Sequence, residues 1–435
     1  MEYESVDCGW EFWVDRGGTF TDVVARDPRG RIRIHKLLSD NPDRYADAPL
    51  HAIRELLGIG AEARLPNARI HSVKMGTTLA TNALLERKGA RVGLLITKGF
   101  ADLLEIGYQD RPDIFALRIE KPETLYAEVR EIEERVLANG TVRQALREES
   151  VNEALSAFRE AGVEAVAILF FHSYAFPAHE LRAGELARDA GFSEVSLSHK
   201  IAREIKAVGR GDTATTNAYL NPLLRRHVED VRSDLGAAIP LRFMQSNGGL
   251  TDADRFIGKN AVLSGPAGGV VAYAHVCQLA GFPRAIGFDM GGTSTDVSRH
   301  DGRFERVFEK RVAGVRLKAP MLHIETVAAG GGSILRFDGQ RFAVGPESAG
   351  ARPGPACYRL GGPATVTDAN LVLGRIQPGY FPKCFGASGD SPLDAAAAWA
   401  ALEALTARVN ETTASPWPVE AVAAGFIRVA NENMV

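Results

Sequence analysis

The chain has 435 residues, a length for about two or three domains, so it can bury substantial cores without disulfide or metal staples. Hydrophobic residues make up 45% of it and charged residues 24%, which excludes a disordered or fibrous chain. Because 51 basic residues are balanced by 54 acidic ones, with a net charge of -3, the sequence carries no electrostatic footprint for nucleic acid. We expect a globular protein with no nucleic-acid partner.

The cysteines are few and far apart. They are Cys8, Cys277, Cys357 and Cys384, with no C-x-x-C pair among them. This spacing favours a reducing compartment over a disulfide framework or a zinc site, so we expect a cytoplasmic location. No uncharged run of about 18 apolar residues occurs, and we expect no membrane partner.

Taken in chain order, amphipathic stretches alternate with short apolar runs. Asn152–Ala161 has helical periodicity and is followed by Gly162, a residue typical of helix ends, and then by the apolar run Val163–Phe171. Thr213–Leu235 is a longer amphipathic segment, predicted to be a helix that opens a second domain. Gly345–Pro363 is rich in Gly and Pro and is predicted to be a loop of fixed shape. This alternation indicates an α/β fold.

One nine-residue pattern occurs twice. Residues 15–23 read DRGGTFTDV and residues 289–297 read DMGGTSTDV, so seven of nine positions are identical at a spacing of 274 residues. Each copy follows an apolar run, Trp10–Val14 or Ala285–Phe288, and paired glycines between two strands predict a tight hairpin turn. After the second copy, Arg303–Lys310 is predicted to supply a third strand.

The repeated Gly-Gly-Thr turn suits a phosphate group, because backbone N–H groups can approach an anion where no Cβ blocks it and the threonine adds a hydroxyl. Asp15 and Asp289, at the ends of the preceding strands, are the candidate catalytic and Mg²⁺-binding residues, since Mg²⁺ prefers a few carboxylates together with phosphates. A single such turn is equally a plain glycine hairpin. Asp22 and Asp296 rank second, because a strand aspartate can simply cap the turn.

Two such turns facing one another are typical of the actin, Hsp70 and sugar-kinase superfamily, whose duplicated ribonuclease-H-like domains enclose a nucleotide cleft. We therefore predict an α/β fold of this kind, with ATP and Mg²⁺ as cofactors. The cradle residues would be Gly17, Gly18, Thr19, Gly291, Gly292, Thr293 and Ser294.

Further segments are candidates for the same cleft. Thr77 and Thr78 begin a predicted helix, where hydroxyls and N–H groups could hold an anion or merely cap the helix. Gly330, Gly331 and Gly332 could approach the nucleotide or form a bulge.

For His323, Glu325, Asp368 and Arg111 the sequence leaves more than one role possible. His323, Glu325 and Asp368 could bind a metal or the substrate. We favour the plainer interpretation, in which Asp368 caps a helix starting near Ala369 and His323 is a satisfied polar residue. Arg111 could recognise a small carboxylate or belong to a salt-bridged surface loop.

Beyond the two turns, long segments of the sequence resemble the hydantoinase and 5-oxoprolinase family. They are HKLLSDNPDRYADAP at 35–49, MGTTLATNALLERKG at 75–89, LSGPAGGV at 263–270, GFDMGGTSTDVS at 287–298 and TVAAGGGSI at 326–334. Segment 35–49 and the loop at 345–363 are more similar to ATP-dependent 5-oxoprolinase than to hydantoinase or acetone carboxylase subunits.

The resemblance implies ATP-driven opening of a small cyclic amide, here 5-oxo-L-proline to L-glutamate with ADP and phosphate. It divides the chain into an N-terminal domain, 1–212, and a second domain, 213–435. The partners it implies are a hydantoinase B-like hydrolytic subunit or a further C-terminal portion, and a homodimer is left open. The alternatives are a hydantoinase or acetone-carboxylase type ATPase subunit and a nucleotide-binding fragment without turnover.

The segment 419–435 bears on whether the second domain is complete. Residues 419–435 form a predicted amphipathic helix without a glycine cap, and only 139 residues follow position 296. Because the two turns are 274 residues apart, we expect the second domain to be incomplete.

Overall fold

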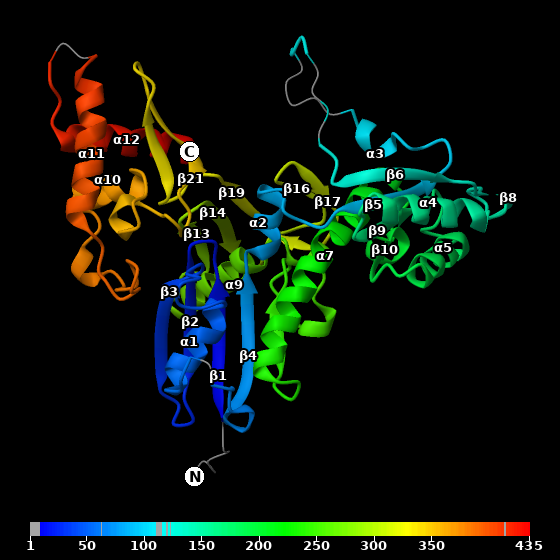
Figure 1. Ribbon diagram of the computed structural model, residues 1–435, viewed down its shortest axis with the longest axis horizontal. Coiled ribbons are helices and arrows are strands. Elements are labelled where there is room, and N and C mark those ends of the chain that lie inside the picture. Colours follow the sequence, from blue (N-terminus) through cyan, green and yellow to red (C-terminus); the bar gives the residue numbers. More distant parts are fainter. Residues whose placement is uncertain (1–8, 62, 110–114, 119–120, 122, 413–414) are drawn as a thin grey trace.

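The computed structural model describes residues 9–61, 63–109, 115–118, 121, 123–412 and 415–435. The helices are α1 Ala48–Leu57, α2 Leu79–Leu85, α3 Leu103–Ile106, α4 Glu148–Glu160, α5 Ala178–Asp189, α6 Ser198–Ile201, α7 Ala207–Leu235, α8 Gly258–Ala261, α9 Ser264–Leu279, α10 Val366–Val372, α11 Ala395–Asn410 and α12 Val419–Met434. The strands, mixed with these along the chain, are β1 Trp10–Arg16, β2 Phe20–Arg26, β3 Ile32–Leu38, β4 Ile70–Thr77, β5 Val92–Thr97, β6 Tyr126–Ile132, β7 Arg135–Val136, β8 Val142–Gln144, β9 Ala165–Leu169, β10 Glu194–Leu197, β11 Leu241–Met244, β12 Leu250–Asp252, β13 Arg284–Met290, β14 Thr295–Asp301, β15 Arg306–Val307, β16 Lys310–Val312, β17 Val315–Leu317, β18 Met321–Leu322, β19 Ile324–Val327, β20 Ser333–Phe337 and β21 Phe342–Ser348. The α/β prediction is confirmed (Figure 1).

A six-stranded mixed sheet lies at the centre, in the order β12-β11-β4-β1-β2-β3. β1 pairs antiparallel with β2 and parallel with β4, so the first glycine turn projects from the middle of the sheet. Helix α1 packs on β1, β2 and β3, and α9 packs on β4 and β11. Buried side chains such as Phe12, Val73 and Phe243 form the core between these layers.

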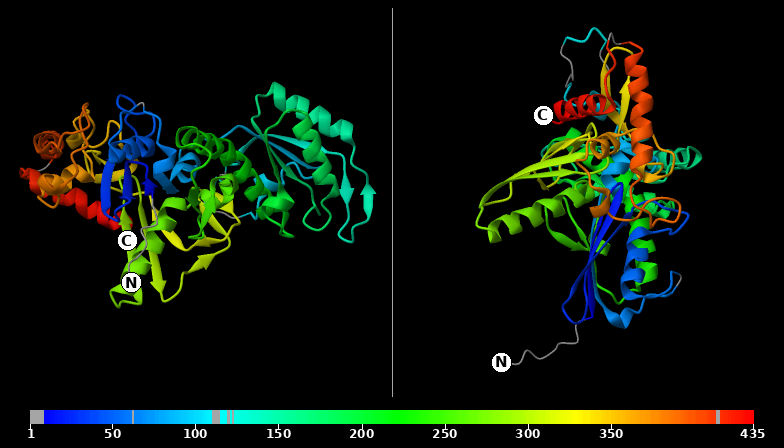
Figure 2. Two further views of the ribbon diagram at one scale, coloured as in Figure 1. Left: turned by 90° about the horizontal axis from the view of Figure 1, so that it is seen from below. Right: turned by 90° about the vertical axis from the view of Figure 1, so that its left-hand side faces the viewer.

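A second, parallel sheet in the order β10-β9-β5-β6 extends to one side of the molecule, away from the C-terminal helices (Figure 2). Helices α4 and α5 cover one side of it and α7 packs against β9 and β10. Every residue of β5 and β9 is buried, as expected for strands covered on both faces. The predicted strand at Val163–Phe171 is confirmed in β9, and the helix before it is α4.

Helix α7 connects the two sheets and begins six residues before the predicted Thr213. The expected division between residues 212 and 213 therefore falls inside this helix. After α7 the chain returns to the central sheet, because β11 pairs with β4 and β12 with β11. The division into residues 1–212 and 213–435 stays a prediction.

The second glycine turn lies in a three-stranded sheet, β13-β14-β19, on which α9 packs. The prediction of a third strand at Arg303–Lys310 was wrong: that stretch holds only the two-residue β15, paired with β18, and the first residue of β16. The third strand is β19, which pairs with β14 from further along the chain. A separate layer of α10, α11 and α12 packs with β20 and β21.

No helix in the described part of the chain is long and apolar enough to cross a membrane. The described cysteines, Cys277, Cys357 and Cys384, are free thiols.

Candidate functional site

The two copies of the repeated pattern adopt the same local structure. In the first turn the backbone N–H of Gly17 donates to the carbonyl of Phe20 at 2.9 Å, and in the second the N–H of Gly291 donates to the carbonyl of Ser294 at 2.9 Å. The strand register is also the same, because Asp15 pairs with Asp22 in one hairpin. Asp289 pairs with Asp296 in the other. The prediction of two hairpins is confirmed.

Both turns line one cavity of about 510 Å³. It brings together eleven of the predicted site residues: Asp15, Gly17, Gly18, Thr19, Thr78, Asp289, Gly291, Gly292, Thr293, Ser294 and Gly331. The turns touch one another across it, since a methyl group added to Gly292 would collide with Thr19 Oγ1 and one added to Gly18 would lie 3.5 Å from Thr293 Oγ1. Glycine is therefore required at position 292 for steric reasons.

Thr19 supplies an unused polar atom at this contact. Its side chain is 4% exposed, and Oγ1 has no hydrogen-bond partner among the described residues. A buried hydroxyl without a partner costs about 1–3 kcal/mol, so it is suited to meet an oxygen-rich group bound between the turns.

Carboxylates line the cavity beside the turns. Asp15 faces the cleft, and the walls of the cleft enclose its carboxyl. This burial, together with the negative charges of Asp22 and Asp289, raises the pKa of Asp15 to about 6. The positive charge of Lys36 acts in the opposite direction and lowers this pKa. Burial also raises the pKa of Asp296, although a hydrogen bond donated by Thr326 at 2.6 Å lowers it. Excess negative charge of this kind favours a bound cation.

The donor set of the cavity fits Mg²⁺ better than a metal held entirely by side chains. No group of three metal-ligating side chains occurs among the described residues. Mg²⁺ is usually held by one or two carboxylates with waters and phosphates supplying the other positions. Asp15 and Asp289 both line the cavity and could hold such an ion.

Three predicted residues lie behind the cavity wall. Thr77 is fully buried, its N–H donates to Ser264 Oγ at 3.2 Å and its own hydroxyl accepts from the N–H of Leu79 at 3.1 Å. Gly330 and Gly332 pack against the second turn, where a Cβ would lie 2.8 Å from the carbonyl oxygens of Gly291 and Gly292 respectively.

The glycine run thus supports the second turn from behind. The N–H of Gly331 donates to the carbonyl of Gly291 at 2.9 Å, and that of Gly332 donates to the carbonyl of Gly292 at 2.7 Å.

One residue of the cavity, Lys36, was missed from sequence. Lys36 Nζ lies 2.6 Å from Asp22 Oδ2 and 4.8 Å from the ring centre of Phe20. Lys36 stands opposite Asp22 in the β2–β3 register, a pairing that motif matching alone does not reveal. Asn82, which follows Thr78 by one helical turn, and Asn370 also line the cavity.

The remaining candidates lie elsewhere. His323 Nε2 is 2.9 Å from Glu325 Oε1 in an exposed charge network with Glu305. Asp368 is fully buried and forms a capping box with Thr365 at the start of α10, so capping is confirmed, with the helix starting at Val366 rather than near Ala369. Arg111 lies outside the described residues.

Comparison with known proteins identifies the family. The profile of the hydantoinase/oxoprolinase N-terminal region matches residues 11–191, and that of hydantoinase/oxoprolinase matches residues 210–435. The chain belongs to the hydantoinase/oxoprolinase family. Within this family it is 47% identical to 5-oxoprolinase 1 of Arabidopsis thaliana over 97% of the chain, which corresponds to 36% of that relative. The chain therefore spans about a third of the length of this relative.

Two solved structures of similar proteins cover 98% of the chain. The ATP-dependent caprolactamase of Pseudomonas jessenii matches with a TM-score of 0.72 and 34% identity, over 62% of its own chain. Nucleotide-free acetone carboxylase matches with a TM-score of 0.80 over 61% of its chain, but at 23% identity this likeness concerns the fold alone.

Proposed function

We propose that this chain binds ATP between its two glycine turns and phosphorylates the amide oxygen of a small cyclic amide. The observation that carries the proposal is the cavity in which two hairpins of identical pattern, backbone bonding and register face each other. A duplicated ribonuclease-H-like arrangement of the actin and sugar-kinase kind, with domains 1–212 and 213–435, accounts for such a pair of turns.

The cyclic amide we propose is 5-oxo-L-proline. The supporting comparison is the 47% identity to a 5-oxoprolinase, against 34% to the solved caprolactamase. A lactam resists water because amide resonance weakens its carbonyl as an electrophile. Transfer of the γ-phosphoryl group to the lactam oxygen, with release of ADP, converts that oxygen into a leaving group. Two waters are then consumed as the ring C–N bond breaks and phosphate leaves, giving L-glutamate.

The residues of the cleft position and neutralise charge in this scheme, which is what phosphoryl transfer chiefly needs. The N–H groups and hydroxyls of the two turns would hold the phosphate oxygens, and Lys36 adds a positive charge beside them. Asp15 and Asp289 would hold Mg²⁺, which when bound neutralises phosphate charge. Thr78, Thr19 and Gly331 complete the wall.

The partner we propose is the further part of the family's polypeptide, either a hydrolytic portion in the same chain or a separate subunit. The supporting fact is that the chain corresponds to 36% of its 5-oxoprolinase relative. Phosphorylation and hydrolysis would then take place in different parts of one assembly.

Calorimetric titration of the chain with Mg²⁺ and a non-hydrolysable ATP analogue, with and without 5-oxoproline, tests the nucleotide site. We expect binding of the analogue that 5-oxoproline tightens. Replacing 5-oxoproline with hydantoin, caprolactam or acetone discriminates among the related activities. Absence of nucleotide binding, both alone and with the further portion supplied, would refute the proposal.

Turnover is tested in the assembly that includes the further portion. Asp289→Asn should lower phosphate release by about 10²-fold or more if this carboxylate holds the metal at the transferring phosphate. Asp301→Asn, at the far end of the same hairpin and outside the cavity, is the matched control and should have near-normal activity. Equal rates for the two variants would remove Asp289 from the mechanism.

A further inference from the structure

The cavity that the two glycine turns line has an aromatic end. Phe20, which directly follows the first turn, lies edge-on to the rings of Tyr358 and Phe381, with ring centres 6.0 and 6.5 Å away. All three side chains line the cavity. Phe385 is fully buried next to them, and its ring centre lies 4.4 Å from that of Tyr358. Aromatic walls of this kind suit a flat ring with little charge.

Asn370 brings to this end a polar group that the fold does not use. It lines the cavity together with Thr367, one helical turn earlier on α10. Its backbone carbonyl accepts from the N–H of Arg375 at 2.9 Å, but its carboxamide has no hydrogen-bond partner among the described residues. The other asparagine of the cavity, Asn82, donates to Thr78 Oγ1 at 3.4 Å. Because a carboxamide offers one acceptor oxygen and two donor hydrogens, that of Asn370 is available to a ligand.

Helix α10 holds Asn370 in a fixed place beside both turns. The N–H and the hydroxyl of Thr367 each donate to the carbonyl of Gly331 at 2.8 Å. Gly331 in turn donates to Gly291 of the second turn. Hydrogen bonds thus connect the helix to the second turn, while Phe20 connects the aromatic wall to the first. A group on so rigid an element can position a ligand closely.

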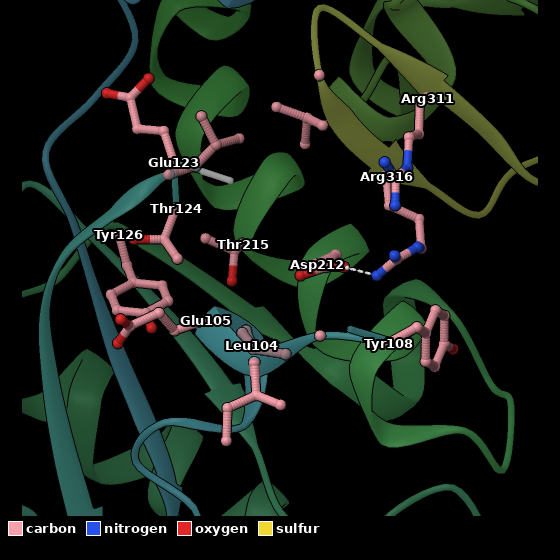
Figure 3. Close-up of a pocket in the computed structure, with 15 residues that line it drawn as sticks. Leu104, Glu105, Tyr108, Glu123, Thr124, Tyr126, Asp212, Thr215, Arg311 and Arg316 are labelled. Carbon is pink, nitrogen blue, oxygen red and sulfur yellow. Dashed lines mark hydrogen bonds and ion pairs between the residues drawn. The ribbon is translucent and has the colours of Figure 1, made fainter. Parts of the chain in front are cut away.

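This location favours the phosphoryl acceptor over the nucleobase. In ATP the adenine is separated from the γ-phosphoryl group by the ribose and two phosphates, whereas the ring that accepts the phosphoryl group must lie directly beside it. A separate cavity of about 70 Å³ lies between α3, α7 and the β16–β17 hairpin (Figure 3) and shares no lining residue with the phosphate cleft. A ring bound there would lie away from the transferred group, unlike one at the aromatic end.

We infer that Asn370 and the aromatic end beside it hold the ring of the cyclic amide, with Asn370 Oδ1 accepting the ring N–H. The inference rests on the proposed function and adds the residue that recognises the amide. In a small lactam ring the N–H and the carbonyl oxygen lie on the same edge. A hydrogen bond from this N–H to Asn370 therefore turns the ring so that its oxygen, the phosphoryl acceptor, lies on the edge that meets the wall of the cleft.

Two ligands and two proteins form a cycle that isolates this hydrogen bond. The ligands are 5-oxo-L-proline and 3-oxocyclopentanecarboxylate, in which CH₂ replaces the ring N–H, and each is titrated calorimetrically into protein saturated with Mg²⁺ and the non-hydrolysable ATP analogue. Wild type should bind the second ligand at least tenfold more weakly, the equivalent of about 1.4 kcal/mol. Asn370→Leu, which removes the carboxamide but keeps a side chain of similar size, should bind both equally. A tenfold difference that persists in Asn370→Leu would overturn the inference, as would equal or absent binding of both ligands in wild type.

Asn152→Leu is the matched control for this cycle. It makes the same replacement at an exposed position of α4, outside the cavity, and should keep the tenfold difference between the ligands. The melting temperature of Asn370→Leu should not fall, because the carboxamide makes no hydrogen bond within the described part of the chain. Loss of the ligand preference in Asn152→Leu as well would overturn the assignment to Asn370.

Phe381→Leu tests the aromatic wall and separates the lactam from adenine. Loss of the ring should weaken binding of 5-oxo-L-proline about threefold or more. Phe308→Leu, at an exposed position outside the cavity, should leave that binding unchanged. If Phe381→Leu instead weakens the ATP analogue alone and leaves 5-oxo-L-proline binding unchanged, the aromatic end holds adenine and the inference is overturned.

The inference and the proposed function can fail separately. Absence of analogue binding in wild type, alone and with the further portion supplied, refutes the proposed function. Analogue binding that 5-oxo-L-proline tightens, together with full ligand preference in Asn370→Leu, would support the proposed function and overturn the inference about Asn370.

Discussion

The pKa of the Asp15 carboxyl is shifted by its surroundings in the phosphate cleft. This carboxyl is packed against Gly76 and Gly265, where an added Cβ would lie 3.4 and 3.5 Å from Oδ1, and it faces the charges of Asp22 and Asp289. Small residues and a perturbed carboxyl thus occur together, as is typical of functional sites.

The raised pKa of Asp15 predicts a pH dependence of stability. The native carboxyl keeps its proton up to about pH 6, but the unfolded chain loses it near 3.8. The native state therefore binds more protons between these values, and without metal the free energy of unfolding falls as pH rises from about 4 to about 6. Asp15→Asn should remove part of this decline, measured by thermal unfolding from pH 4 to 8.

Mg²⁺ should raise the free energy of unfolding at the pH values where deprotonation of Asp15 lowers it. It binds the deprotonated carboxyl, so it should stabilise the wild-type chain above pH 6 and less at pH 5. Asp27→Asn is the control, because Asp27 pairs with Arg31 away from the cleft. A Mg²⁺ effect of equal size in Asp15→Asn would mean that the ion binds elsewhere.

At the scale of elements, the contact between the two hairpins decides whether the phosphate cradle can close. A Cβ at position 292 meets Thr19 Oγ1 and Cβ. Gly292→Ala should therefore push the turns apart and weaken binding of the ATP analogue at least tenfold. Gly60→Ala is the control, since nothing lies within 4 Å of a Cβ there. Calorimetric titration of both variants checks this, and equal affinities would show that the turns do not act as a pair.

We expect replacement of Asp368 to affect stability rather than chemistry. Its carboxylate accepts hydrogen bonds from the N–H groups of Ala356, Cys357 and Thr365, so it fixes the Gly- and Pro-rich loop as well as α10. Asp368→Ala should lower the free energy of unfolding by about 3 kcal/mol, measured with urea. The exposed turn residue Asp338, which bonds only Gln340 and Arg341 nearby, should cost less than about 1 kcal/mol when replaced by Ala.

These elements also show which features a sequence can reveal. The glycine hairpins were predictable because a strand, a glycine turn and a strand are adjacent in the chain, and the turn bond joins positions three apart. The strand β19 and the residue Lys36 were not, since both depend on pairing registers between strands. Asp368 looked like a cap and is one, but its bonds to the loop depend on tertiary packing.

At the scale of the whole molecule, strand β13 exposes large apolar side chains. Gly287 packs against Tyr273 of α9, which directs Ile286, Phe288 and Met290 to the opposite face of the strand, where they are 75%, 60% and 37% exposed. Among the described strands β13 pairs only with β14, so one edge is unpaired. An apolar edge strand is a template for association with another chain.

The chain should therefore associate with itself through the β13 edge. Phe288→Lys should shift it toward monomer, because a charge on an edge strand opposes strand addition. Phe308→Lys removes an aromatic ring of similar exposure, 67%, that lies outside the strands and serves as the control. Light scattering across a concentration series measures the effect. Equal shifts in both variants would point to general hydrophobicity, whereas a shift in Phe288→Lys alone identifies the β13 edge.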